Sequence, residues 1–275
     1  MHIANSNPMC CFFKEIPMSA QNSNSRKDCS RVREPVSNTR KVYILRLIGR
    51  CAVLAISVLL CIFAPDQFDI IDGFSFFRKL SLLHILWVIW VIDMIFQLVP
   101  VRHYISLGSQ KLFKSRFKPI REKINYAALR EYVIATTKSA YKVFIIWTVL
   151  LAVLGLLHYF GVISNTVLFM TSVVFYVCDL ICVLIWCPFR LIMKNRCCTT
   201  CRIFNWDHLM MLSPMMFAGG FYATTLVLLA IGVWIVWELC VMMYPERFWE
   251  NSNEALRCSE CTDKLCTQYC RKLRK

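Results

Sequence analysis

The sequence predicts an all-α fold, a polytopic transmembrane helix bundle with an amphipathic cytoplasmic segment and a cysteine-rich C-terminal tail. Of the 275 residues, 57% are hydrophobic and only 18% are charged, whereas about a quarter of an ordinary soluble domain is charged. The apolar residues also gather into runs that are long enough to cross a bilayer. We count about five such runs, which gives the expected number of spans.

Four of the runs are clear, because a span requires roughly 20 predominantly apolar residues to cross about 30 Å of hydrocarbon. They lie at about 47–64, 80–100, 143–163 and 167–189. In the fifth run, Ser213 followed by Pro214 offers an N-cap and a first-turn proline. We therefore expect a short interfacial helix and one further span over about 214–241, which completes a bundle over 46–243.

Basic residues predict the orientation of this bundle, because Lys and Arg are enriched in cytoplasmic loops. Seven of them lie in residues 1–45, ten in 101–142 and four in 190–208, whereas 160–166 contains none. We therefore expect a cytoplasmic N-terminus, with 1–45 as a largely disordered basic tail. The net charge of +15 lies mostly between the apolar runs. This placement indicates the lipid bilayer and its anionic inner-leaflet lipids as partners and argues against nucleic acid.

The C-terminal tail, residues 244–275, does not fit this charge pattern. A single fifth span places the tail outside, yet the tail contains seven Lys or Arg. If the chain instead turns back where Gly219 is followed by Gly220, the tail is cytoplasmic. The single span is the preferred interpretation, and the turn at the two glycines is the alternative.

The basic segment 101–142 has a helical pattern of its own. Phe113, Phe117 and Ile120 follow the spacing i, i+4, i+7, and basic residues fill the remaining arc. This pattern is typical of an amphipathic helix that lies on the inner leaflet. A solvated basic loop packed on the protein itself is the alternative.

Sixteen cysteines form the second unusual feature, and two clusters of them lie outside the apolar runs. The candidate metal ligands are Cys197, Cys198, Cys201 and His208 in one cluster and Cys258, Cys261, Cys266 and Cys270 in the other. Four thiolates can close a tetrahedral zinc site or hold an iron–sulfur cluster. In an oxidising compartment the tail cysteines would form two disulfides instead, and free thiols are the third alternative.

The two cysteine clusters can also be combined. Cys258 and Cys261 together with Cys198 and Cys201 would supply four thiolates to one metal ion. This joint site requires both clusters to lie on the same side of the membrane. The path of the fifth apolar run therefore decides whether the joint site can form.

Several ionisable residues lie inside the apolar runs or near their ends, where burial costs about 2.5–3.5 kcal/mol on insertion scales. These intramembrane polar candidates are Asp93, Asp179, Glu238, His84 and His158. One interpretation is an ion, proton or metal path, with His84, His158 and Glu238 clustered near the outer surface and Asp179 leading to the cytoplasmic cysteines. The alternative, which we favour for each single residue, is hydrogen bonding between helices.

Three stretches of the second half carry a resemblance: VCDLICVLIWCPF, MKNRCCTTCRIFNWDHLMM and PERFWENSNEALRCSECTDKLC. Together they resemble a group of uncharacterised multi-pass membrane proteins of Firmicutes, mostly clostridial. The resemblance covers about 170–266, and the string CCTTCRIFNWDH is its most specific part. It implies a bacterial cytoplasmic membrane, and it implies neither an activity nor functional residues.

Three classes of function are compatible with these features. The leading hypothesis is a non-enzymatic membrane protein that binds zinc or an iron–sulfur cluster, for metal handling or as a redox subunit. The second is an interaction or assembly protein that docks a protein partner and uses structural disulfides or a zinc knuckle. The third is a membrane thiol oxidoreductase with Cys198 and Cys201 as its exchanging pair. No phosphate-binding loop, nucleophile elbow or HExxH motif is present.

Overall fold

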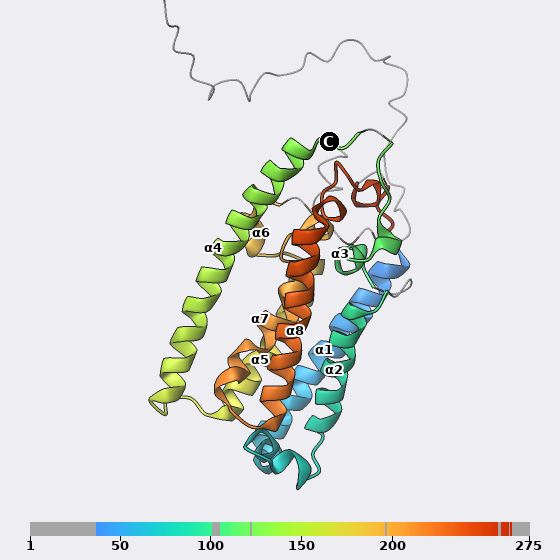
Figure 1. The fold of residues 1–275 in the computed structure, drawn as a ribbon. Coiled ribbons are helices and arrows are strands. Elements are labelled where there is room, and N and C mark those ends of the chain that lie inside the picture. The colour runs from blue at the N-terminus through green and yellow to red at the C-terminus, as the bar shows by residue number, and fades with distance from the viewer. Residues whose placement is uncertain are drawn as a thin grey trace, which may run out of the picture. The chain divides into compact units, whose positions relative to one another are not determined.

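A computed structural model of the protein describes residues 37–100, 105–121, 123–195, 197–257, 260–263 and 265. The regular structure of the described residues is helical, which confirms the all-α prediction (Figure 1). The α-helices are α1 (Asn38–Phe63), α2 (Leu83–Leu98), α3 (Leu107–Gln110), α4 (Tyr126–Tyr159), α5 (Asn165–Leu184), α6 (Phe189–Met193), α7 (Asp207–Leu212) and α8 (Phe221–Met243). Short 3₁₀ segments connect several of them. The predicted tail 1–45 lies outside the described residues up to residue 36, and α1 begins earlier than expected.

Among the described residues, four helices are long and apolar enough to cross a membrane, namely α1, α4, α5 and α8. Helix α2 has 16 residues, fewer than the roughly 20 that a span requires. It begins at Leu83 rather than near residue 80, because the Ser81 hydroxyl donates to the Gln67 carbonyl (3.0 Å) and so holds the preceding loop in place. Where the sequence predicts about five spans, the structure thus contains four candidate spans and one shorter apolar helix.

Capping side chains explain where three of these helices begin. The Ser37 hydroxyl accepts a hydrogen bond from the Arg40 amide at the start of α1. Asn125 accepts from two amides in the first turn of α4, and Ser164 accepts from one in the first turn of α5. Each cap satisfies backbone donors that have no partner inside the helix, which stabilises the helix start by about 1 kcal/mol.

The fifth apolar run does not form one continuous helix over 214–241. Helix α7 and the 3₁₀ segment Ser213–Phe217 pack against α5 and α8. The chain then reverses at Gly219 and Gly220, which have φ values of +72° and +42°. A side chain at Gly220 would collide with the Ile71 carbonyl oxygen, so this close backbone approach needs glycine.

Helix α8 therefore returns along the bundle instead of leaving it. Its first amide, on Phe221, donates to the Gly73 carbonyl (2.8 Å). Near its other end, Glu238 binds Arg202 and Trp206, which precede α7 in the chain. The turn at the two glycines, which is the alternative interpretation of the sequence, agrees with this path.

Most of the connecting segments meet at one end of the bundle, which we call the loop end. It contains the start of α1, residues 105–121, 197–206, 244–257 and 260–263. The Ser37 hydroxyl donates to the Asp263 carbonyl (2.5 Å), and the Glu254 amide donates to the Lys118 carbonyl (2.9 Å). The start of α1 and the described part of the C-terminal tail therefore lie at the same end. The preferred expectation that they lie on opposite sides is wrong, because the chain reverses before α8.

The amphipathic helix expected around Phe113, Phe117 and Ile120 is not formed. Only Lys114–Arg116 makes a short 3₁₀ turn, and the chain then becomes extended. Pro119 pairs with Asn253 in an isolated antiparallel bridge, and the Ile120 amide donates to the Ser252 carbonyl. Proline lacks the amide that a helix interior needs, so this segment packs on the tail instead. The alternative of a basic loop packed on the protein is confirmed for this stretch.

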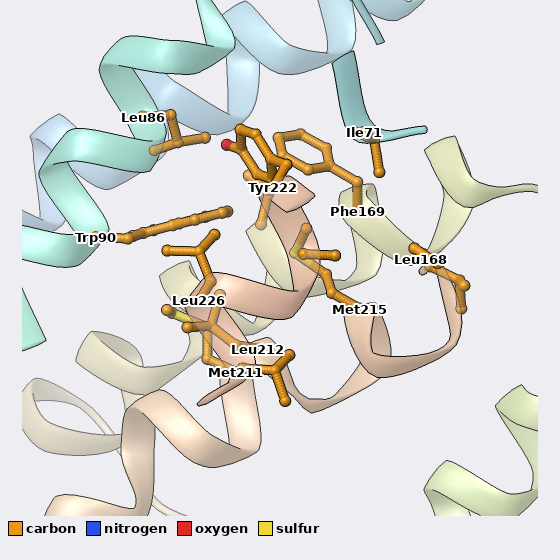
Figure 2. Packing of buried hydrophobic residues seen from close by; sticks show 14 of the residues in the cluster. Ile71, Leu86, Trp90, Leu168, Phe169, Met211, Leu212, Met215, Tyr222 and Leu226 are labelled. Atoms are coloured by element: carbon orange, nitrogen blue, oxygen red, sulfur yellow. The ribbon is translucent and has the colours of Figure 1, made fainter. Parts of the chain in front are cut away.

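Buried aromatic and aliphatic side chains join α2, α5, α8 and the 207–217 segment (Figure 2). Phe169 on α5 lies between Trp90 on α2 and Tyr222 on α8, with ring centroids 5.9 and 6.1 Å away. The Tyr222 hydroxyl donates to the Leu83 carbonyl (3.1 Å), which satisfies its buried polar group. Since lipid is as apolar as these side chains, their close packing rather than water exclusion holds the helices together.

Candidate functional site

One buried lysine fixes the backbone of the cysteine loop, residues 197–201. Lys111 is fully buried, and its ammonium group donates to the Thr199 carbonyl (2.9 Å) and the Cys201 carbonyl (2.7 Å). The rings of Trp237 and Phe248 lie 5.3 and 5.5 Å from the same nitrogen. The hydrogen bonds of this buried ammonium group therefore fix the backbone of a cysteine-rich loop.

An ion pair fixes the other side of this loop. The guanidinium of Arg202 donates to both carboxylate oxygens of Glu238, at 2.8 and 2.5 Å. The indole of Trp206 donates to the same carboxylate (2.8 Å), and the indole of Trp237 donates to the Arg202 carbonyl (2.9 Å). Glu238 thus stabilises the end of the cysteine loop. Its charge is tolerated there because it is paired and hydrogen-bonded.

Lys111 forms no ion pair with a carboxylate among the described residues. Burial lowers the pKa of Lys111 to about 7. The neighbouring thiols of Cys201, Cys197 and Cys198, when ionised, would raise this pKa. The nearest groups that can become anionic are therefore cysteines. This role of Lys111 cannot be predicted from the sequence, because Lys111 is one of many basic residues in its segment.

Five thiols from two regions of the chain line one largely apolar cavity of about 260 Å³. They are Cys178, Cys182, Cys187, Cys198 and Cys201. The Cys198 sulfur lies 4.0 Å from the Cys182 carbonyl oxygen, so the loop packs directly on the last turn of α5. Three cysteines of the fourth predicted span, Cys178, Cys182 and Cys187, thus share a cavity with two predicted ligands.

The acidity of these thiols differs. Burial raises the pKa of Cys198 to about 12, and it also raises the pKa of Cys201. The pKa of Cys187 is lowered to about 7, chiefly by a hydrogen bond from the Cys182 thiol and also by the backbone amides of Phe189 and Arg190. Without a bound cation, the Cys198 and Cys201 pair lacks the thiolate that disulfide exchange requires.

A complete metal site is not assembled from the described residues, which contain no group of three or more His, Cys, Asp or Glu able to hold an ion. His208 is not placed as a fourth ligand for the cysteine loop. It is buried and contacts Gln97 (2.9 Å) and Asp207 (3.3 Å) instead. Three other predicted ligands, Cys258, Cys266 and Cys270, lie outside the described residues.

The two aspartates of the apolar runs meet a buried arginine that the sequence interpretation overlooked. Arg50 on α1 donates to Asp179 (2.5 Å) and to the Tyr176 carbonyl (2.7 Å), and it lies 4.0 Å from Asp93. Its guanidinium also stacks over the Tyr176 ring at 4.0 Å. An arginine inside the predicted run 47–64 was the available signal, since such a residue needs an acidic partner.

These charges border a second, smaller cavity of about 50 Å³, which is also lined by Gln97, Asp207 and His208. Asp179 lies at the wall of both this cavity and the cysteine cavity. The ion pairs and hydrogen bonds around Asp93 and Asp179 agree with the interpretation that they link helices. They connect α1, α2 and α5 through a single arginine.

The expected outer cluster of His84, His158 and Glu238 is wrong. The ring of His84 contacts the Phe76 carbonyl (2.9 Å), and the ring of His158 contacts the Ile163 carbonyl (3.0 Å). Both histidines therefore stabilise loops away from the loop end, where Glu238 lies. The error follows from the direction of α8, which runs opposite to the one expected.

Comparison with known proteins supplies no family for this chain. No protein-family model matches it, and no curated protein or solved structure is significantly similar to it. We therefore infer function from the chain's own residues and their arrangement.

Proposed function

We propose that the protein is a non-enzymatic, metal-binding protein of a bacterial cytoplasmic membrane. Its metal, a zinc ion or an iron–sulfur cluster, would be held jointly by Cys198 and Cys201 of the loop and Cys258 and Cys261 of the tail. Such a centre suits metal handling or a redox subunit. The observation that carries this proposal is the return of α8, which leaves the loop and the tail at the same end of the bundle.

One short segment, α3 with Lys111 directly after it, contacts both the cysteine loop and the C-terminal tail. The Leu107 amide at the start of α3 donates to the Asp263 carboxylate (2.7 Å). Directly after α3, Lys111 donates to the Cys201 carbonyl (2.7 Å). The same short segment therefore contacts both the tail, through Asp263, and the cysteine loop, through Cys201. Cys261 lies two residues before Asp263 in the chain.

The tail also contacts the helix that carries the other thiols. Leu265 is buried against Leu180 and Leu184 in the last turns of α5. Cys198 contacts the carbonyl of Cys182 in the same turns. The two cysteine segments therefore approach the end of α5 from different parts of the chain.

Lys111, buried beside the loop, would offset the charge of thiolates once a bound metal ion holds them ionised. A zinc ion with four thiolates carries net negative charge, and its burial needs nearby cations. Lys111 is buried and donates to the Cys201 carbonyl, and the buried Arg202 directly follows Cys201 in the chain. Metal binding would give the Lys111 ammonium the anionic neighbour that the described carboxylates do not provide.

The proposed orientation places the loop end in the cytoplasm. Segment 105–121 carries five Lys or Arg, and Arg202, Arg247 and Arg257 also lie at the loop end, whereas the opposite end holds Arg78 and Lys79. Positive loops remain on the cytoplasmic side. A reducing cytoplasm disfavours disulfides, so the thiols would remain free to bind metal.

Metal analysis of the purified protein tests the proposal. We expect near-stoichiometric zinc or iron in the wild-type protein and its loss in Cys198→Ser and in Cys261→Ser. The matched control is Cys61→Ser, because Cys61 is an exposed cysteine of α1 far along the chain from either cluster. A wild-type protein without zinc or iron, or a Cys261→Ser protein with full metal content, would contradict the proposal.

A second candidate function is supported by one observation, the lowered pKa of Cys187 beside Cys182. A membrane thiol oxidoreductase would then use this pair instead of the expected Cys198 and Cys201. A Cys182→Ser variant would retain a mixed disulfide between Cys187 and a substrate thiol, visible as a shifted band on a non-reducing gel. Failure of any such adduct to accumulate excludes this candidate.

A further inference from the structure

A shallow groove of about 500 Å³ lies between α4 and α6, apart from the cysteine loop. Its lining residues are Lys142, Ile145, Ile146, Leu191, Ile192 and Lys194. The set contains four aliphatic side chains and two lysines, and no carboxylate. This lining provides an apolar surface next to two positively charged groups.

The aliphatic side chains of the groove are open to the surroundings. Leu191 is 73% exposed, Ile145 60% and Ile146 54%. Exposed apolar surface of this kind on a membrane helix is in contact with lipid tails. The walls of the groove therefore suit an acyl chain.

The two lysines lie where lipid headgroups are expected. After Lys142 no Asp, Glu, Lys or Arg occurs until Asp179, so Lys142 marks the end of the charged part of α4. Lys194 ends α6 in the left-handed region, with φ +50°, and both lysines are exposed. Neither forms an ion pair with a described carboxylate. Lysines at this boundary extend their ammonium groups to the interface.

We propose that this groove is a specific binding site for one anionic phospholipid. Lys142 and Lys194 bind its phosphate, and an acyl chain lies along Ile145 and Leu191. Two ammonium groups without a carboxylate favour a headgroup with net negative charge over a zwitterionic one. The site does not depend on the proposed metal centre.

Native mass spectrometry of the detergent-purified protein, titrated with phosphatidylglycerol or phosphatidylcholine, tests the site. We expect the wild-type protein to retain phosphatidylglycerol preferentially. The double variant Lys142→Gln/Lys194→Gln should bind it about 25-fold more weakly, because each lysine near a lipid surface contributes about fivefold. The matched control Lys41→Gln/Lys114→Gln removes the same charge from two other exposed lysines and should bind as the wild type does. Equal retention of both lipids, or unchanged affinity of the groove variant, overturns the proposal.

A photoactivatable phosphatidylglycerol locates the bound lipid in the intact wild-type chain. We expect adducts on peptides that contain residues 142–146 and 191–194. Adducts confined to other helices overturn the proposal. Because this measurement needs no variant, it holds even if the substituted proteins fold poorly.

Discussion

At the scale of single residues, three buried basic side chains connect separate parts of the chain. Lys111, Arg202 and Arg50 are each buried, and each donates to a backbone carbonyl or to a carboxylate. Two of them have carboxylate partners, whereas Lys111 has carbonyl oxygens and aromatic rings. Because an unpaired buried charge is costly, removing the partner of any of these side chains should lower the stability of the protein.

Lys111→Met tests whether the buried ammonium supports the proposed metal site. Methionine fills a similar volume but leaves two buried carbonyls without a donor, which costs about 1–3 kcal/mol each. We expect a lower metal content and faster metal loss to a chelator, with Lys114→Met as the exposed control. An unchanged rate of metal loss would show that Lys111 has no role in the site.

Glu238→Gln tests the ion pair that braces the cysteine loop. The substitution leaves the buried Arg202 without its anion, and breaking a buried pair costs about 3–5 kcal/mol. We expect a clearly lower unfolding temperature in detergent. The double variant Arg202→Met/Glu238→Gln should recover part of the loss, because no unpaired charge remains. If the double variant is as unstable as the sum of the single ones, the two residues do not act as a pair.

At the scale of elements, the reversal before α8 determines the rest of the architecture. It depends on Gly220, which has a positive φ and lies directly against the Ile71 carbonyl. A methyl group at this position must displace backbone atoms rather than a flexible side chain. The helices on either side can then no longer pack as they do.

Gly220→Ala should therefore destabilise the protein by more than about 2 kcal/mol, from the clash and the strained φ together. Gly232→Ala in the middle of α8 is the control, because a methyl group there meets nothing within 4 Å. The control should be stabilised by about 0.5–1 kcal/mol, since alanine favours the helix. Thermal unfolding in one detergent compares the two, and equal stabilities would refute the role of the turn.

The sequence predicts the long helices well because their apolar runs are continuous. The starts of α1 and α4 are missed, since their first turns are polar and set by Ser37 and Asn125 caps rather than by hydropathy. The expected helix around Phe117 fails because Pro119 and the contact with the tail outweigh a helical pattern. In each case a helix cap or a long-range contact determines the local structure. The periodicity of the sequence does not reveal such contacts.

The candidate site is harder to predict for the same reason. The motif spacing identifies Cys198 and Cys201, but their contacts with Lys111 and Cys182 come from distant segments. His208 follows the cysteines closely in sequence and nevertheless faces Gln97 on another helix. Proximity along the chain therefore misleads where the backbone reverses.

At the scale of the whole molecule, the path of the chain brings the start of α1 and the tail together. Reporter fusions after residue 275 and before residue 1 test the membrane orientation of both ends. We expect both reporters to be active in the cytoplasm, because the basic segments share the loop end. A third reporter inserted after Gly161 should be active outside. A C-terminal reporter active only outside would contradict the proposed topology.

The most direct test of the joint metal site is X-ray absorption spectroscopy of the zinc-loaded protein. We expect a shell of four sulfurs at about 2.3 Å in the wild type. Cys198→Ser and Cys261→Ser should each reduce it to three sulfurs with one lighter ligand, because each cluster contributes to the same ion. A shell that is unchanged by either substitution, or one that responds to only one cluster, would contradict a site shared by the loop and the tail.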